Sequence, residues 1–167
     1  MKIGIMADSH ENMPMIAKAI ECFNYAQVDL VLHAGDIISP ITFKEFKNLK
    51  SKFIAVFGNN DGEKSLLRKK FNELGMEIYP SPYELTIEGK RTLLCHAPNF
   101  LDDLIKNSLY DVIIYGHTHT VDVQKGKTLV INPGECGGWL TGRYTVGILK
   151  LPQCEVEIVD LEDKGER

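Results

Sequence analysis

The sequence predicts an α/β fold in which two mixed β-sheets pack face to face with helices outside them, a four-layer αββα sandwich. Two observations predict it. The first half of the chain alternates strand and helix patterns, and the second half consists mostly of β-hairpin patterns. A third observation concerns function, because every histidine lies at or just after the end of a predicted strand. Open α/β sheets bind ligands at the carboxyl ends of their strands, so this edge is the expected site.

Apolar spacing defines the elements of the first half. The expected order is a strand at 2–6, a helix after Asn12 through 15–23, a strand at 30–33, a helix at 41–49, a strand at 53–57 and a helix at 65–74. Asn12 is a suitable N-cap for the first helix, and Gly75 is suited to end the third. This half is therefore predicted to form a parallel βαβαβα unit.

The second half has the pattern of antiparallel pairs. The expected elements are strands at 83–87 and 91–95, a short helix at 101–107, a strand at 112–115, a hairpin of 121–125 and 128–131 turning at Gly126, and a last pair at 145–151 and 155–161. The charged tail from Glu162 is expected to fray. No repeat or linker interrupts the pattern, which indicates one domain over residues 1–167.

Composition excludes several classes of protein. An apolar content of 44% and a charged content of 25% are typical of a soluble globular domain. The net charge of −4 disfavours a general nucleic-acid or anionic-membrane surface, and no stretch suits a transmembrane helix or signal peptide. The four cysteines are scattered without a CxxC pair, which predicts core thiols rather than disulfides or a thiolate zinc site. We therefore expect a cytoplasmic protein without membrane or specific nucleic-acid partners.

Polar side chains gather at the predicted strand ends. The histidines are His10, His33, His96, His117 and His119, and the oxygen donors at equivalent positions are Asp8, Asp36 and Asn59. Taken alone, His117 and His119 could equally be two solvated loop residues. The full set of nitrogen and oxygen donors suits Mn²⁺, Fe, Ni²⁺, Co²⁺ or Zn²⁺, and it exceeds the roughly four ligands that one zinc ion needs. It suits two ions about 3.5–4 Å apart that share one bridging carboxylate.

Five short motifs carry a resemblance to a known family. Asp8-x-His10, Gly35-Asp36, Gly58-Asn59, His96 and Gly116-His117-x-His119 occur in the order typical of calcineurin-like metallophosphoesterases, and the match spans residues 1–161. The small size, the Gly-Asn-Asn-Asp variant at 58–61 and the Asn-Pro-Gly segment at 132–134 most resemble the YfcE-like phosphodiesterase branch. This resemblance implies a dinuclear site in which Asp36 bridges the ions. By position, Asp8, His10 and His119 would hold one ion and Asn59, His96 and His117 the other.

The chain departs from the family pattern at Asn60. Many members have a histidine there, which is taken to assist the leaving group, whereas an asparagine amide cannot act as a general acid. General acid catalysis is worth roughly 10²–10⁴-fold in rate, so we expect a preference for substrates with good leaving groups. Asp36, Asn60 and Asp61 are the residues that we expect to act in catalysis, with Asp61 supporting the site rather than ligating a metal.

The sequence therefore predicts a phosphodiesterase that uses a dinuclear centre and a metal-bound hydroxide, with Mn²⁺ or Ni²⁺ as the first candidates. The expected substrate is a small phosphodiester, and a homo-oligomer is compatible with the sequence. Two alternatives remain: a protein-binding scaffold resembling the retromer subunit of this fold, and a nuclease or nucleotide phosphohydrolase. His33 could support the site or be a hydrogen-bonded core residue, and Arg143 could meet a phosphate or form a surface ion pair.

Overall fold

The computed structural model describes residues 1–162, so most of the tail that we expected to fray lies outside the described residues. Within residues 1–162 the strands form two mixed sheets, which confirms the predicted fold class. The six-stranded sheet has the order β11 (Glu155–Asp160), β10 (Thr145–Lys150), β1 (Lys2–Met6), β2 (Leu30–His33), β3 (Lys52–Val56), β4 (Glu77–Tyr79). The five-stranded sheet has the order β5 (Tyr83–Ile87), β6 (Lys90–Leu94), β7 (Val112–Ile114), β9 (Leu129–Pro133), β8 (Val121–Gln124).

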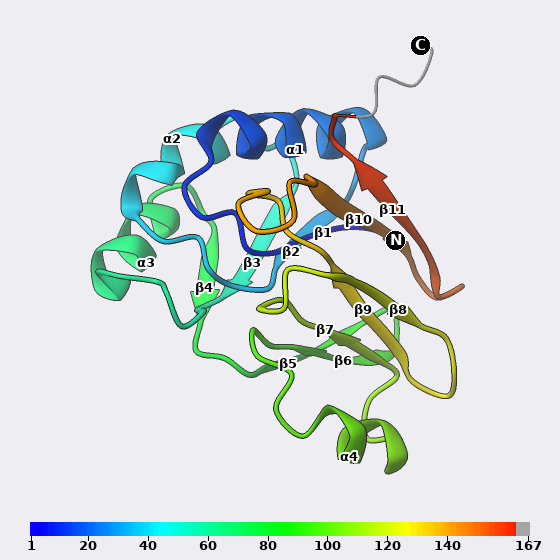
Figure 1. Ribbon diagram of the computed structural model, residues 1–167. Coiled ribbons are helices and arrows are strands. Elements are labelled where there is room, and N and C mark those ends of the chain that lie inside the picture. The colour runs from blue at the N-terminus through cyan, green and yellow to red at the C-terminus, as the bar shows by residue number, and fades with distance from the viewer. Residues whose placement is uncertain (163–167) are drawn as a thin grey trace.

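Helices cover the outer faces of both sheets (Figure 1). The helices are α1 (Met13–Ala26), α2 (Phe43–Phe46), α3 (Lys64–Asn72) and α4 (Leu101–Lys106). The first three lie against the six-stranded sheet, and α4 lies against the five-stranded sheet. Separate apolar clusters fill the spaces between the layers, and the middle one joins the two sheets through side chains such as Ile5, Leu32 and Ile114. Burial of these faces is the main stabilising term of the sandwich.

Of the three helices expected in the first half, α1 and α3 begin near the predicted residues, and the second is much shorter than predicted. Helix α1 has Asn12 as its N-cap, whose side chain accepts from the Met15 N–H, and α3 ends before Gly75. The predicted helix at 41–49 is instead a 3₁₀ turn, Pro40–Thr42, followed by the single turn of α2. The side chain of Asn24 on α1 donates to the Asn48 carbonyl and accepts from the Lys50 N–H. After α2 the N–H groups of Asn48 and Leu49 donate to carbonyls three residues back, so the chain continues as tight turns instead of α-helix.

Two features of the six-stranded sheet could not be predicted from local sequence patterns. Strand β4 has only three residues, too few for a recognisable strand pattern. It nevertheless pairs in parallel with β3. Strand β10, from the far end of the chain, pairs antiparallel with β1 and brings the β10–β11 hairpin into the first sheet. The prediction of a second half made mostly of hairpins is also incomplete, because β7 pairs in parallel with both β6 and β9.

These parallel pairings position the candidate site. Strands β1, β2 and β3 run side by side in one sheet, and β6 and β7 run side by side in the other. The loops that follow these five strands therefore meet at one edge of the sandwich, between the two sheets. Backbone hydrogen bonds join the loops directly, since the Asp8 N–H donates to the Gly35 carbonyl and the Gly116 N–H donates to the His96 carbonyl.

Candidate metal centre

The loops at this edge hold the candidate ligands in a strained backbone conformation. Five of the residues predicted as ligands have a positive φ: Asp8 (49°), His10 (41°), Asp36 (61°), His117 (69°) and His119 (59°). Left-handed backbone is uncommon outside glycine, and residues held there cluster at functional sites. Asp and His tolerate this conformation better than most residues, and its repetition in five candidate ligands indicates that the loops are shaped to direct these side chains to the site.

The first cluster consists of Asp8, His10 and His119. Asp8 Oδ1 lies 3.8 Å from His10 Nε2 and 3.6 Å from His119 Nε2. Both Asp8 Oδ1 and His10 Nε2 are buried without a hydrogen-bond partner among the described residues. A buried polar atom without a partner costs about 1–3 kcal/mol, so two such atoms facing each other need an explanation. A cation bound between them would satisfy both.

The second cluster consists of Asn59, His96 and His117. Asn59 Oδ1 lies 2.8 Å from His96 Nε2 and 2.9 Å from His117 Nδ1. The other ring nitrogen of His96, Nδ1, lies 2.9 Å from the Ala34 carbonyl and must donate to it. In a neutral His96 this fixes the tautomer and leaves an Nε2 lone pair directed at Asn59 Oδ1, which is also an acceptor. Facing acceptors of this kind are suited to a shared cation.

Asp36 lies between the two clusters. Its Oδ2 atom is 3.5 Å from His10 Nε2 and 3.4 Å from His96 Nε2. Asn60 holds this carboxylate in place, since its backbone N–H donates to Oδ1 and its side-chain amide donates to Oδ2. Burial alone would raise the pKa of the Asp36 carboxyl, but the facing His96 and the Asn60 donors hold that pKa well below its usual range. Asp36 is thus an ionised carboxylate within reach of both clusters.

Protons and metal cations compete for the imidazole nitrogens of His10 and His96. The Asp8 carboxylate raises the pKa of His10 above its ordinary value, against the lowering effect of burial. Burial likewise lowers the pKa of His96, but the facing Asp36 carboxylate outweighs it and the net shift is upward. Both imidazoles therefore lie where the carboxylates favour a positive charge. A divalent ion supplies that charge, and it needs the imidazoles neutral.

The structure places Asp61 beneath the site. Its carboxylate accepts from the backbone N–H groups of Asp36, Ile38 and Gly58 and so ties two of the loops together. The loop that contains Gly58 also lies close to the Asp36 carboxylate. A side chain at position 58 would prevent this contact, because a Cβ there would lie 2.1 Å from Asp36 Oδ1. Gly116 is constrained in the same way, with its Cβ position 2.8 Å from Asp8 Oδ2.

Glu135 is a site residue that the sequence did not reveal. It is fully buried, and Glu135 Oε2 lies 2.8 Å from His119 Nδ1, which donates to it. The opposite oxygen accepts from the Thr141 backbone N–H and hydroxyl. Burial alone would raise the pKa of Glu135, but these donors hold that pKa below its usual value. Glu135 thereby fixes the tautomer of His119 and leaves its Nε2 lone pair facing Asp8.

The two residues with open assignments, His33 and Arg143, belong to neither cluster. His33 is fully buried, with Nδ1 accepting from the Gly35 N–H and Nε2 lying 3.0 Å from Ser9 Oγ. Burial lowers the pKa of His33 to about 3, so it is a neutral core histidine that links the first two loops. Arg143 is exposed and pairs with Asp160 on β11 at 3.7 Å. This ion pair agrees with the surface interpretation of Arg143.

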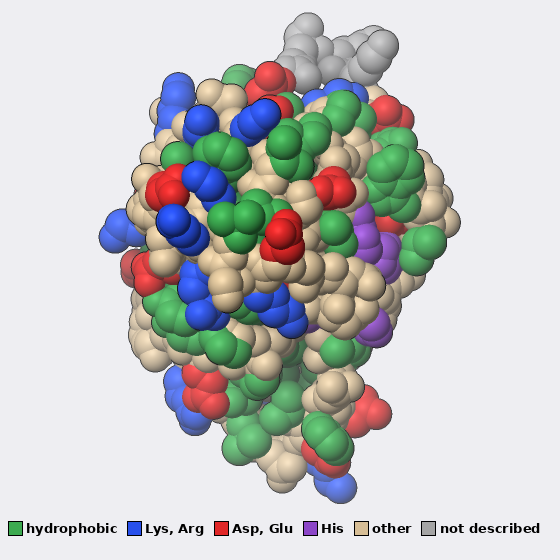
Figure 2. Space-filling view, turned by 90° about the vertical axis from the view of Figure 1, so that its left-hand side faces the viewer, with side chains coloured by type: hydrophobic (Ala, Val, Ile, Leu, Met, Phe, Trp, Pro, Cys, Tyr) green, Lys and Arg blue, Asp and Glu red, His purple; other side chains and the backbone are tan. Residues whose placement is uncertain are grey.

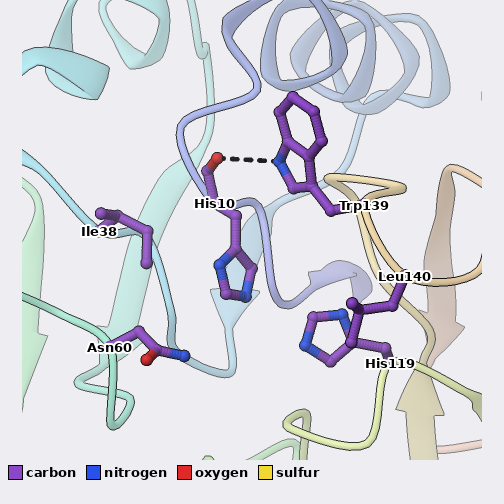
Figure 3. A pocket seen from close by; sticks show the side chains of 6 residues that line it. All are labelled: His10, Ile38, Asn60, His119, Trp139 and Leu140. Carbon is purple, nitrogen blue, oxygen red and sulfur yellow. Dashed lines mark hydrogen bonds between the residues drawn. The ribbon is translucent and has the colours of Figure 1, made fainter.

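A cavity of about 610 Å³ opens beside the clusters. The six residues that line it are His10, Ile38, Asn60, His119, Trp139 and Leu140 (Figure 3). Ile38 and Asn60 stand on one side of His10, and Trp139, Leu140 and His119 stand on the other. A cavity of this size is typical of a small-molecule site. In Figure 2 the histidine side chains that are visible lie towards the right-hand side of the molecule, bordered by hydrophobic side chains.

Comparison with known proteins gives a consistent result. Residues 1–153 match the model of the calcineurin-like phosphoesterase superfamily domain. The chain is 44% identical over 166 residues to phosphodiesterase MJ0936 of Methanocaldococcus jannaschii, covering 97% of this chain and 100% of the relative. It is 28% identical over 152 residues to phosphodiesterase YfcE of Escherichia coli, covering 80% and 78% of the two chains.

Solved structures of similar fold agree with the match to the calcineurin-like phosphoesterase domain. A structure described as a novel archaeal phosphodiesterase superposes with a TM-score of 0.90 at 42% identity and covers 96% of this chain and 99% of that one. A Vps29 variant from Entamoeba histolytica superposes with a TM-score of 0.69 at 17% identity, covering 96% and 99%, which shows a shared fold alone.

Among the described residues, no helix has both the length and the apolar character needed to cross a membrane.

Proposed function

Because the chain belongs to the calcineurin-like phosphoesterase superfamily, we propose that it is a metal-dependent phosphodiesterase with a dinuclear centre at the joined strand ends. One observation carries the dinuclear assignment. Asp36 Oδ2 lies almost equally far from His10 Nε2 and His96 Nε2, at 3.5 and 3.4 Å, so one carboxylate faces both clusters. The expected substrate is a small phosphodiester.

The donor chemistry fits two divalent transition-metal ions. Asp8, His10 and His119 would hold one ion, Asn59, His96 and His117 the other, and Asp36 would bridge them. Nitrogen and oxygen donors without thiolate favour Mn²⁺ or Ni²⁺, with Fe, Co²⁺ and Zn²⁺ as alternatives. When bound, such a pair supplies an activated water as nucleophile and neutralises the charge on the phosphoryl oxygens.

The protein's own residues hold this geometry. Glu135 keeps His119 in the tautomer with Nε2 free, and Ala34 does the same for His96 through its carbonyl. Asn60 orients the bridging carboxylate through two hydrogen bonds, while its amide cannot transfer a proton to a leaving oxygen. We therefore assign Asn60 to positioning and expect fast turnover only where the leaving group is a stable oxyanion.

The test is hydrolysis by metal-stripped protein reloaded with Mn²⁺, Ni²⁺ or Zn²⁺, assayed on phosphodiesters, phosphomonoesters and nucleotides. We expect diester hydrolysis that requires metal and is lost in Asp8→Asn. Asp102→Asn, an exposed carboxylate change on α4, is the matched control and should keep wild-type activity. Diester hydrolysis that persists in chelator, or in Asp8→Asn with verified metal depletion, would contradict the proposal.

A further inference from the structure

Two large apolar side chains stand exposed beside the metal centre. Trp139 is 65% exposed and Leu140 is 74% exposed, although both line the cavity that contains His10 and His119. Exposed apolar side chains that form a contiguous patch bordered by polar residues are a feature of ligand-binding grooves, whereas isolated ones are common on any surface. The cavity also contains Ile38, so apolar side chains stand on both sides of His10 (Figure 3).

Hydrogen bonds position this apolar wall, which consists of Trp139 and Leu140. The Trp139 indole N–H donates to the His10 carbonyl at 3.1 Å, which fixes the direction of the ring. The Leu140 N–H donates to the Glu135 carboxylate, which also binds His119. Gly137 completes the fixation, since its N–H donates to the Asp8 carbonyl and a Cβ there would lie 2.9 Å from that oxygen. The wall is therefore built from the same contacts that orient two of the candidate ligands, and it is preorganised for binding.

The charge of the cavity limits what the wall can accept. None of the residues that line it within the described chain is Lys or Arg. On the face shown in Figure 2, the Lys and Arg side chains gather to the left of the histidines. A second phosphate group on the substrate would therefore find no cationic side chain in the cavity. A diester with one negative charge and an uncharged planar substituent matches both the charge and the apolar lining.

We propose that Trp139 and Leu140 bind an aromatic ring carried by one ester group of the substrate, and that this contact selects aromatic over alkyl phosphodiesters. The ring could belong to an aryl ester or to the base of a nucleoside, which share the flat apolar face that an indole binds. This inference rests on the proposed function, because it places the phosphoryl group at the metal centre.

Trp139 is the only tryptophan in the chain, so its fluorescence reports directly on binding. The probes are phenyl methylphosphonate and methyl methylphosphonate, which carry the same single charge and differ in the ring, added to Mn²⁺-loaded protein. We expect the phenyl compound to change Trp139 emission. By calorimetry it should bind about threefold to tenfold more tightly than the methyl compound, which is the gain in affinity typical of contact between two aromatic rings. Thymidine 5′-methylphosphonate identifies the source of the ring: tighter binding than the phenyl compound indicates a nucleoside, and weaker binding indicates an aryl ester.

Three variants separate ring binding from a structural role. Trp139→Ala should abolish the preference for phenyl, whereas Trp139→Phe should retain most of it because a ring remains. Phe100→Ala, which removes an exposed aromatic side chain beside α4, should change nothing. Metal content is measured in each variant. Equal affinity of wild-type protein for the phenyl and methyl probes, or a phenyl preference that survives Trp139→Ala, would overturn this inference.

The inference and the proposed function can fail separately. Diester hydrolysis without any preference for the ring overturns the role of Trp139 and leaves the phosphodiesterase assignment intact. Absence of both hydrolysis and probe binding overturns both. If Trp139→Ala instead changes the elution volume of the protein without changing the phenyl preference, the wall is an interface between two copies of the chain, and the inference is wrong.

Discussion

Glu135→Gln tests whether the buried carboxylate beneath His119 controls metal binding. In the wild-type protein His119 Nδ1 donates to Glu135 Oε2, while the Thr141 N–H and hydroxyl donate to Oε1. A glutamine has one oxygen and one NH₂ group, so it cannot accept on both sides. If its oxygen faces Thr141, its NH₂ group faces His119 and forces the proton of the neutral imidazole onto Nε2. That nitrogen is then no longer available as a ligand.

The expected magnitude follows from this mismatch. A buried donor that faces another donor costs about 1–3 kcal/mol, which corresponds to roughly 10- to 100-fold in an equilibrium constant. The same range is typical for changes to residues that orient a metal-binding histidine. We therefore expect Glu135→Gln to weaken binding of one of the two ions by about 10- to 100-fold, with a comparable loss of activity when metal is limiting.

The assay is calorimetric titration of metal-free protein with Mn²⁺ or Ni²⁺, with elemental analysis of the loaded protein. Thr141→Val is the matched control, because it removes one hydroxyl donor to Glu135 and leaves the contact with His119. Its metal affinity should fall by less than that of Glu135→Gln, because the lost hydrogen bond does not involve His119 and the Thr141 N–H still donates to the same oxygen. Wild-type metal affinity in Glu135→Gln would refute the role given to Glu135.

Three further predictions concern the residues around the bridge. Asp36→Asn should reduce turnover by more than the roughly 100-fold of a supporting residue, and near-normal turnover with full metal content would exclude a bridge. Asn60→His should raise activity most for substrates with poor leaving groups, seen as a shallower plot of log rate against leaving-group pKa; parallel plots would argue against a missing general acid. Burial holds the pKa of His33 near 3 in the folded protein, whereas the unfolded chain takes up a proton below 6.5. Stability is therefore lost as the pH falls below about 6.5, by about 2 kcal/mol at about pH 5, and chemical denaturation of metal-free His33→Asn should show this loss removed. An unchanged pH dependence in that variant would contradict the buried neutral histidine.

Local patterns predicted most of the fold. Buried β-branched runs place β1, β2 and β3 within one residue of the observed strands, and helical spacing places α1 within three residues of the observed helix. They failed where tertiary contacts decide the structure. The turns after α2 are held by Asn24 on α1, and β10 pairs with β1 from the far end of the chain. Neither contact leaves a local signal in the sequence.

The candidate site could also be predicted in part, where local patterns were enough to place a residue. A donor that directly follows a parallel strand must lie at the common edge, which brings Asp8, Asp36 and His96 together without knowledge of any contact. Glu135 could not be found this way, because its contact with His119 depends on the pairing of β7 with β9. Its only local signal is an acidic residue within a glycine-rich loop. The exposure of Trp139 likewise depends on how that loop packs against the β1–α1 loop.

The Asp36 carboxylate is proposed to join two metal sites. The most direct test is the number of ions bound per chain, measured by elemental analysis after loading metal-free protein and removing excess metal, in wild-type protein and in His117→Ala. We predict close to two ions in the wild-type protein and close to one in His117→Ala, in which the cluster of Asn59 and His96 loses a ligand while Asp8, His10 and His119 stay intact. A single ion in fully active wild-type protein would contradict the dinuclear account.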